Sequence, residues 1–112
     1  MMNVYEELYD TILSRRSDNA EGSYTKYLFD KGLDKILKKV GEECSETIIA
    51  AKNSEHGADN TELKNEIADL LYHLFVLCAE RDLPLTEVED VLAERAKKTG
   101  NLKQMKTVDK NT

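Results

Sequence analysis

Apolar residues recur at the three- and four-residue spacing of amphipathic helices along most of the chain. The pattern predicts helices at residues 3–16, 33–53 and 61–81, a short helical or turn segment at 23–29, and a last helix that ends before Gly100. Residues 53–60 are rich in turn formers and predict a loop. The sequence therefore predicts an all-α fold, a bundle of four to five helices.

The last helix and the tail are predicted from capping and polarity. Thr86 and Glu89 have the spacing of a capping box, so we expect the last helix to begin there, after the break at Pro84. Residues 101–112 are polar, and we expect them to form a flexible tail beyond a single domain of residues 1–100.

The helix predicted at residues 61–81 is apolar on two sides. Its main stripe consists of Leu63, Ile67, Leu70, Leu71, Leu74 and Cys78, and its second apolar face of Ala68, Tyr72, Phe75, Val76 and Ala79. A helix with two apolar faces is buried on both, and a chain of 112 residues has few elements to cover them. We therefore expect a central helix and a homodimer.

Charge and composition limit the possible partners. The chain has 22 acidic and 16 basic residues, a net charge of -6 that disfavours nucleic acid and anionic membranes. Its apolar runs are short and its N-terminus lacks a basic and apolar leader, so we expect no membrane span and a cytoplasmic protein. Cys44 and Cys78 fall on apolar stripes, which predicts buried thiols rather than a disulfide.

Two clusters of acids are the candidate chemistry. They are Glu42, Glu43 and Glu46 and, after 19 further residues, Glu66 and Asp69. Acids three residues apart share one flank of a helix, and crowded carboxylates repel unless a cation lies between them. Mg²⁺ prefers such oxygen ligands. The spacing does not by itself separate a magnesium site from two solvated charged faces.

Three further features allow more than one interpretation. His73 lies four residues after Asp69, so it does not form the Glu-x-x-His motif of di-iron bundles; a hydrogen-bonded structural histidine is favoured over contact with ligand or substrate. Gly41 in mid-helix allows close approach of a helix or substrate, or is a tolerated irregularity. For residues 23–25, backbone capping and substrate contact both stay open.

Three segments together resemble a known family. They are Ser23-Tyr24-Thr25, the run GLDKILKKVGEECSE from Gly32 to Glu46, and EIADLLYH from Glu66 to His73. Over residues 23–100 the chain resembles the phosphoribosyl-ATP pyrophosphohydrolases. That family is similar in fold to the MazG-like all-α nucleoside triphosphate pyrophosphatases, whose pattern Glu-Glu-x-x-Glu followed by Glu-x-x-Asp is intact here.

The resemblance implies hydrolysis of phosphoribosyl-ATP to phosphoribosyl-AMP and pyrophosphate, the second step of histidine biosynthesis, with Mg²⁺. It implies metal ligation and catalysis by Glu43, Glu46, Glu66 and Asp69, with Glu42 as an extra ligand or base. It also gives phosphate-binding candidates, namely Lys35, Lys38 and Lys39 and, more weakly, Arg95 and Lys98. A solvated lysine face is the alternative for these cations. The alternatives for the whole chain are a house-cleaning pyrophosphatase that acts on free nucleotides and a non-enzymatic helical interaction module.

Overall fold

The computed structural model describes the chain except residues 1, 18–21, 58, 101 and 112. The described residues form five α-helices and a short 3₁₀ helix: α1 (Val4–Ser17), α2 (Tyr24–Lys31), α3 (Leu33–Ser54), α4 (Thr61–Glu80), α5 (Leu85–Ala96) and η1 (Thr107–Asn111). No strand occurs among the described residues, so the all-α prediction is confirmed. The three long predicted helices agree with α1, α3 and α4 to within one residue at each end.

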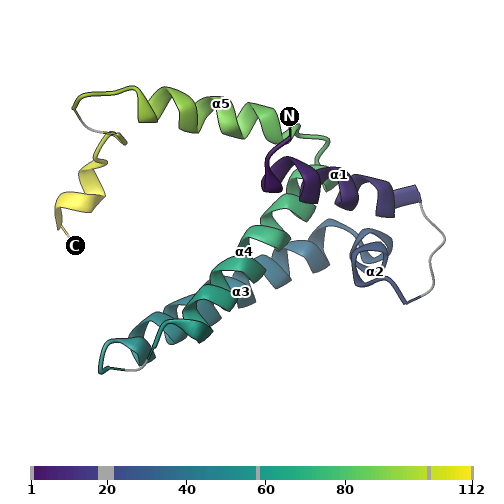
Figure 1. Cartoon of the computed structure of the whole chain (residues 1–112), viewed down its shortest axis with the longest axis horizontal. Helices are drawn as coiled ribbons and strands as arrows, with labels where there is room; N and C mark the ends of the chain where they lie inside the picture. Colours follow the sequence, from purple (N-terminus) through teal and green to yellow (C-terminus); the bar gives the residue numbers. More distant parts are fainter. Residues whose placement is uncertain (1, 18–21, 58, 101, 112) are drawn as a thin grey trace.

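Helices α3 and α4 form a long antiparallel pair; α1 and α2 pack at one end of it, and α5 starts at that end and runs away from the pair (Figure 1). The hydrophobic core lies at that end and draws on all five α-helices: Tyr9, Ile12, Leu28, Ile36, Phe75, Val76, Ala79 and Leu85. Only the first turns of α3 and the last turns of α4 contribute to this core. The remainder of the α3–α4 pair projects from it as an arm.

The link from α2 to α3 is a tight turn at Gly32. Ser23 caps the N-terminus of α2, because its Oγ accepts a hydrogen bond from the Lys26 backbone N–H at 3.1 Å. Gly32 adopts φ 93°, a conformation that favours glycine, and its N–H donates to the Leu28 carbonyl. This turn places α2 against the first part of α3.

Side chains of α1 fix the turn between α4 and α5. The Arg16 guanidinium donates to the Ala79 carbonyl at 2.6 Å and to Asp82 Oδ1 at 3.0 Å. The Tyr9 hydroxyl donates to the Leu83 carbonyl at 2.7 Å. These hydrogen bonds attach α1 to the last turn of α4 and to the segment that follows it.

The capping box predicted at residues 86–89 is wrong. Helix α5 begins at Leu85 after an extended Pro84, so Thr86 lies inside the first turn. Leu85 is buried in the core as the first residue of the helix, so the N-cap is Pro84, two residues before the predicted cap at Thr86. Glu89 instead accepts a hydrogen bond from the Asn3 side chain at 3.0 Å.

The arm leaves much apolar surface uncovered. On α4 the second apolar face is buried at Phe75, Val76 and Ala79, whereas the main stripe is only partly covered. Ile48 of α3 is 64% exposed. The radius of gyration is 16.6 Å, whereas a compact domain of this length has about 13 Å. One chain therefore covers only one side of the central helix.

The prediction for Cys44 is wrong. This thiol is exposed, because it lies on the part of α3 that extends beyond the core. Cys78 is partly buried, and neither cysteine forms a disulfide. Within the described residues, no helix combines the length and apolar character needed to cross a bilayer.

Candidate functional site

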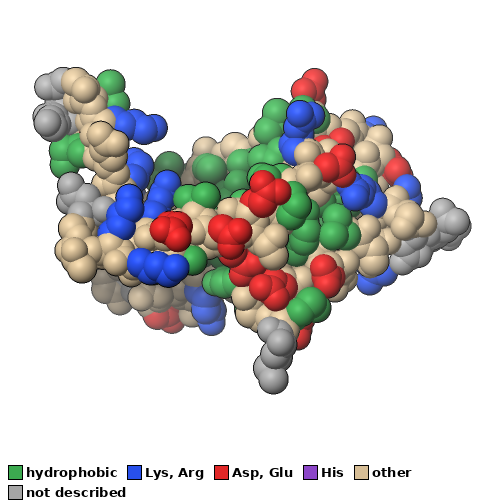
Figure 2. All heavy atoms as spheres, turned by 90° about the horizontal axis from the view of Figure 1, so that it is seen from above, with side chains coloured by type: hydrophobic (Ala, Val, Ile, Leu, Met, Phe, Trp, Pro, Cys, Tyr) green, Lys and Arg blue, Asp and Glu red, His purple; other side chains and the backbone are tan. Residues whose placement is uncertain are grey.

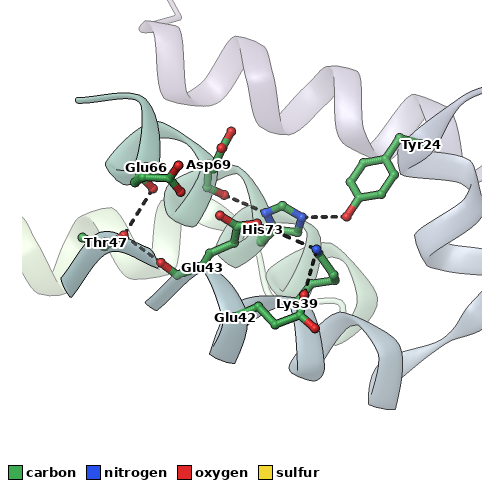
Figure 3. Close-up of polar contacts among 8 residues, drawn as sticks. All are labelled: Tyr24, Lys39, Glu42, Glu43, Thr47, Glu66, Asp69 and His73. Atoms are coloured by element: carbon green, nitrogen blue, oxygen red, sulfur yellow. Dashed lines mark hydrogen bonds and ion pairs between the residues drawn. The ribbon is translucent and has the colours of Figure 1, made fainter. Parts of the chain in front are cut away.

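The two acid clusters meet across the α3–α4 pair. Glu43 and Glu46 of α3 and Glu66 of α4 each place a carboxylate oxygen within 4.8 Å of the other two. Glu43 is 6% exposed, Glu66 is half-buried and Glu46 is exposed. Asp69 lies outside this group of three, on the α4 turn that follows Glu66 (Figure 3). The cluster therefore extends from a buried carboxylate, Glu43, to a solvent-exposed one, Glu46.

Burial and the neighbouring carboxylates disfavour the ionised forms of Glu43 and Glu66, and so raise the pKa of each. Burial first, and then the neighbouring Glu46 and Asp69 carboxylates, raise the pKa of Glu43, and Lys39 opposes the shift. Burial and Glu46, with smaller contributions from Glu43 and Asp69, raise the pKa of Glu66. A cation bound between the carboxylates of Glu43, Glu46 and Glu66 would favour the ionised forms of Glu43 and Glu66 and so oppose the rise in the pKa of each.

The donor set fits a hard divalent cation. Glu43 Oε2 and Glu66 Oε2 are buried, and neither has a hydrogen-bond partner among the described residues. Buried polar atoms are normally paired, so two such oxygens at a junction of three carboxylates indicate a site for an external partner. Oxygen ligands alone favour Mg²⁺ over softer transition metals.

Thr47 joins the two helices beside the carboxylates. Its hydroxyl donates to the Glu43 carbonyl of its own helix at 2.8 Å and lies 3.4 Å from the Glu66 carbonyl of α4 (Figure 3). The backbones that bear Glu43 and Glu66 are therefore held together at this point. Sequence reasoning did not identify Thr47; its position four residues after Glu43 was the available signal.

Lys39 lies at one side of the cluster. Its ammonium is 2.9 Å from Glu42 Oε2 and 3.9 Å from Glu43 Oε1. The bond to Lys39 lowers the pKa of Glu42, and the same bond raises the pKa of Lys39. Glu42 therefore points toward Lys39, whereas Glu43 joins the group of three. Lys35 and Lys38 of the same helix also act electrostatically on Glu42.

The two remaining predicted cations lie elsewhere. Arg95 is on α5 and Lys98 follows that helix, which runs away from the α3–α4 pair (Figure 1). Figure 2, which views the molecule from above Figure 1, shows basic side chains gathered on the left, the side toward which α5 runs. A single chain does not bring Arg95 and Lys98 together with the acids.

A buried histidine connects α4 to α2. His73 is 4% exposed, and its two ring nitrogens lie 2.7 Å from the Asp69 carbonyl (Nδ1) and 3.0 Å from the Tyr24 hydroxyl (Nε2) (Figure 3). The preferred interpretation, a hydrogen-bonded structural histidine, agrees with this geometry. The hydroxyls of Thr25 and Tyr72 make a second hydrogen bond between the same helices. Ser23, Tyr24 and Thr25 thus cap α2 and attach it to α4.

Gly41 faces open space. A Cβ added there would meet no atom within 4 Å, apart from the adjacent residues and the local helix backbone. The structure therefore gives no close helix approach within the chain as the reason for this glycine. Approach of a substrate and a tolerated irregularity remain as the two interpretations.

Comparison with known proteins gives consistent results. A family model described as phosphoribosyl-ATP pyrophosphohydrolase matches residues 5–96, a span that includes the five α-helices except the first residue of α1. A phosphoribosyl-ATP pyrophosphatase of Listeria monocytogenes is 50% identical over 106 residues, which are 95% of this chain and 98% of the relative. That of Streptococcus sanguinis is 53% identical with the same coverage. That of Bacillus cereus is 47% identical over 109 residues, 97% of this chain and 98% of the relative.

Proposed function

The chain belongs to the phosphoribosyl-ATP pyrophosphohydrolase family, and we propose on this premise that the α3–α4 carboxylates carry its catalytic site. The protein is a hydrolase that converts phosphoribosyl-ATP to phosphoribosyl-AMP and pyrophosphate, a step of histidine biosynthesis. The observation that supports the location of the site is the convergence of three carboxylates from two helices within 4.8 Å.

Magnesium is the proposed cofactor. Its ligands would be the four acids at the junction of the two helices: Glu43, Glu46, Glu66 and Asp69. The two buried oxygens without partners support this assignment, as does the all-oxygen donor set. When bound, the cation supplies positive charge that offsets the charge of both the carboxylates and the substrate's phosphates. The carboxylates must be ionised to hold it, so metal binding weakens as the pH falls.

The flanking residues of α3 have distinct proposed roles. Lys35, Lys38 and Lys39 lie beside the acids and supply cations for the triphosphate. Glu42 is outside the group of three but lies beside it on α3, so we assign it the role of accepting the proton of the attacking water. For Arg95 and Lys98 we propose substrate contact only in an assembled dimer, because α5 carries them away from the acids of their own chain.

A homodimer is the proposed assembly. A groove between α1, α4 and α5 is lined almost entirely by apolar side chains, among them Tyr5, Leu71, Leu74, Cys78 and Leu92. Continuous apolar surface of this kind is typical of an interface between subunits. A second copy would cover the stripe of α4 that one chain leaves open. We place the enzyme in the cytoplasm, because its two unpaired thiols suit a reducing compartment.

The decisive experiment is an assay of the purified protein with phosphoribosyl-ATP, with and without MgCl₂. We expect release of pyrophosphate and phosphoribosyl-AMP with Mg²⁺, and loss of activity in Glu66→Gln. A panel of free nucleoside triphosphates and deoxynucleoside triphosphates tests the alternative of a house-cleaning enzyme, which faster turnover of the panel would favour. If the folded protein released no pyrophosphate from any of these substrates, the result would favour the alternative of a non-enzymatic helical interaction module.

A further inference from the structure

Three tyrosine rings form a row beside the carboxylate site. The ring of Tyr24 neighbours those of Tyr72 and Tyr27, at centroid distances of 6.2 and 6.1 Å and with interplanar angles of 29° and 25°. The Tyr24 hydroxyl lies 3.0 Å from one ring nitrogen of His73, and the other nitrogen contacts the Asp69 carbonyl (Figure 3). Printed contacts thus connect the row to the α4 turn that bears the acids, and Tyr27 is its outer member.

The two rings from α2 are open to solvent. Tyr24 is 44% exposed and Tyr27 is 41% exposed, and neither lines the apolar groove that we propose as the subunit interface. Neighbouring exposed aromatic side chains are typical of a surface that meets a partner. Rings at small interplanar angles present their flat faces in one direction, and a planar ring system can stack on such a face. The row therefore suits a ligand with a planar aromatic group.

Two lysines flank the outer end of the row. Lys31 Nζ lies 5.8 Å and Lys35 Nζ 6.0 Å from the centroid of the Tyr27 ring, one on each side of the turn at Gly32. Both distances are at the outer limit of a cation–π contact. Within the described part of the chain, neither ammonium forms an ion pair with a carboxylate. Cations beside an exposed aromatic face suit a ligand that combines a planar base with phosphates.

The cations of α3 lead from the acids toward this end of the row. Glu43, Lys39 and Lys35 are four residues apart, so they share one flank of the helix with about 6 Å between successive positions. In the other direction the next cation of α3 is Lys52, two turns beyond the last acid. A triphosphate bound at the acids therefore finds cations on the side of Tyr27, and the nucleoside attached to it lies near the row.

We propose that Tyr27 stacks on the adenine base of phosphoribosyl-ATP and that Lys31 binds the phosphate of its phosphoribosyl group. This substrate carries anionic groups at two places, the triphosphate and the phosphoribosyl phosphate, whereas ATP has only the triphosphate. The cations assigned to the triphosphate are on α3, and Lys31 lies beyond them, on α2. Lys31 thus distinguishes the substrate from free ATP. This inference rests on the proposed location of the catalytic site.

The test compares three ligands that share successive parts of the substrate: phosphoribosyl-ATP, ATP and inorganic triphosphate. We measure kcat and KM for the first, and competitive inhibition constants for the other two, with full-length protein at saturating MgCl₂. Tyr27→Leu keeps apolar bulk but removes the aromatic face, so it should raise KM and the ATP constant about tenfold, within the range for one lost base stack. Tyr27→Phe should change both by less than about twofold, and neither variant should alter the constant for inorganic triphosphate.

Lys31→Met separates the phosphoribosyl phosphate from the base. It should raise KM for phosphoribosyl-ATP about five- to tenfold, the range for one charge-assisted hydrogen bond at an exposed site, with kcat and the ATP constant within about twofold. Lys26→Met is the matched control, because it removes the same charge from α2 at a position where the ammonium pairs with Asp30 at 2.9 Å. Its KM should stay within about twofold. Circular dichroism checks the fold of each variant, and sedimentation checks its assembly.

Each part of the proposal has results that contradict it. An unchanged KM in Tyr27→Leu would refute the stacking, as would an equal rise in its constant for inorganic triphosphate, and loss of a dimer in this variant would assign the ring to the subunit interface instead. An unchanged KM in Lys31→Met, an ATP constant that rises with it, or an equal effect of Lys26→Met would refute the role of Lys31. Unmodified, folded protein that does not hydrolyse phosphoribosyl-ATP would refute the proposed function itself.

Discussion

Replacing Glu43 by glutamine should stabilise the metal-free protein and abolish its stabilisation by magnesium. Glu43 is the most buried acid of the group of three, and its Oε2 has no hydrogen-bond partner among the described residues. Glutamine keeps the shape of the side chain and removes its charge. The variant therefore relieves repulsion in the folded state and at the same time loses a metal ligand.

The size of the effect follows from the distances. Two unit charges at a separation of 4.8 Å, the upper limit within this group, repel by about 1 kcal/mol in a water-like dielectric and about 3.5 kcal/mol at an effective dielectric of about 20. Glu43 faces two such neighbours, Glu46 and Glu66, while Lys39 at 3.9 Å offsets roughly one of them. Because Glu46 is exposed and screened by solvent, we expect a net gain of about 1–2 kcal/mol, or roughly 4 °C in Tm for each kcal/mol.

The pH dependence has a definite sign. The pKa of Glu43 is raised above its ordinary value of 4.5, so the folded protein holds this proton more tightly than the unfolded chain does. Between the unfolded and the raised folded pKa, the native state binds more protons, and stability falls as the pH rises. The advantage of Glu43→Gln over the unmodified protein should therefore grow across this window and be complete above it.

Thermal unfolding at fixed protein concentration, followed by circular dichroism with and without MgCl₂, measures both effects. Magnesium at about 100 times its Kd should add about 2.7 kcal/mol to the unmodified protein, so that the order of the two Tm values reverses. Asp90→Asn removes a remote exposed charge from α5 and serves as control. Equal stabilisation of Glu43→Gln and the unmodified protein by magnesium would refute the reasoning, as would a variant that is less stable than the unmodified protein without metal at pH 8.

Three further changes test other parts of the molecule. Glu42→Gln should lower kcat about 100-fold or more if this carboxylate accepts the proton of the attacking water; a loss below tenfold in a steady-state assay would contradict that role. Gly41→Ala should raise the free energy of unfolding by up to about 1 kcal/mol in urea titrations, because the space beside it is open; lower stability would disagree. Leu74→Glu places a charge in the apolar groove and should yield monomers in analytical ultracentrifugation, whereas an unchanged sedimentation coefficient would argue against dimerisation through that groove.

The long helices were predictable because the information that specifies them is local. The apolar spacing along α1, α3 and α4 reproduces their ends to within one residue. The start of α5 was not predictable from local spacing, because it depends on the burial of Leu85 among residues distant in sequence. A capping signal at Thr86 was outweighed by that tertiary contact, which sequence spacing does not report.

The candidate site was predictable as a set of acids but not as a geometry. Spacing placed the carboxylates on one flank of each helix, and the rotation of α3 against α4 then selected Glu43, Glu46 and Glu66. The same rotation directs Glu42 toward Lys39. The contact between Tyr24 and His73 requires knowledge of where α2 docks, and no periodic pattern contains that information.

The exposed stripe and the crowded acids have the same physical meaning. Both lie on the α3–α4 pair, and both are unfavourable in an isolated chain: the stripe leaves apolar surface in water, and the acids repel one another. Polar residues or better packing could have removed the exposed apolar surface, and a single Glu→Gln change could have reduced the repulsion among the acids. The proposed function accounts for both features: a second copy would cover the stripe, and a cation would offset the charge of the acids. On that proposal, the stability given up at the carboxylates is the condition for binding the metal, since a cluster that was already neutral would have little affinity for it.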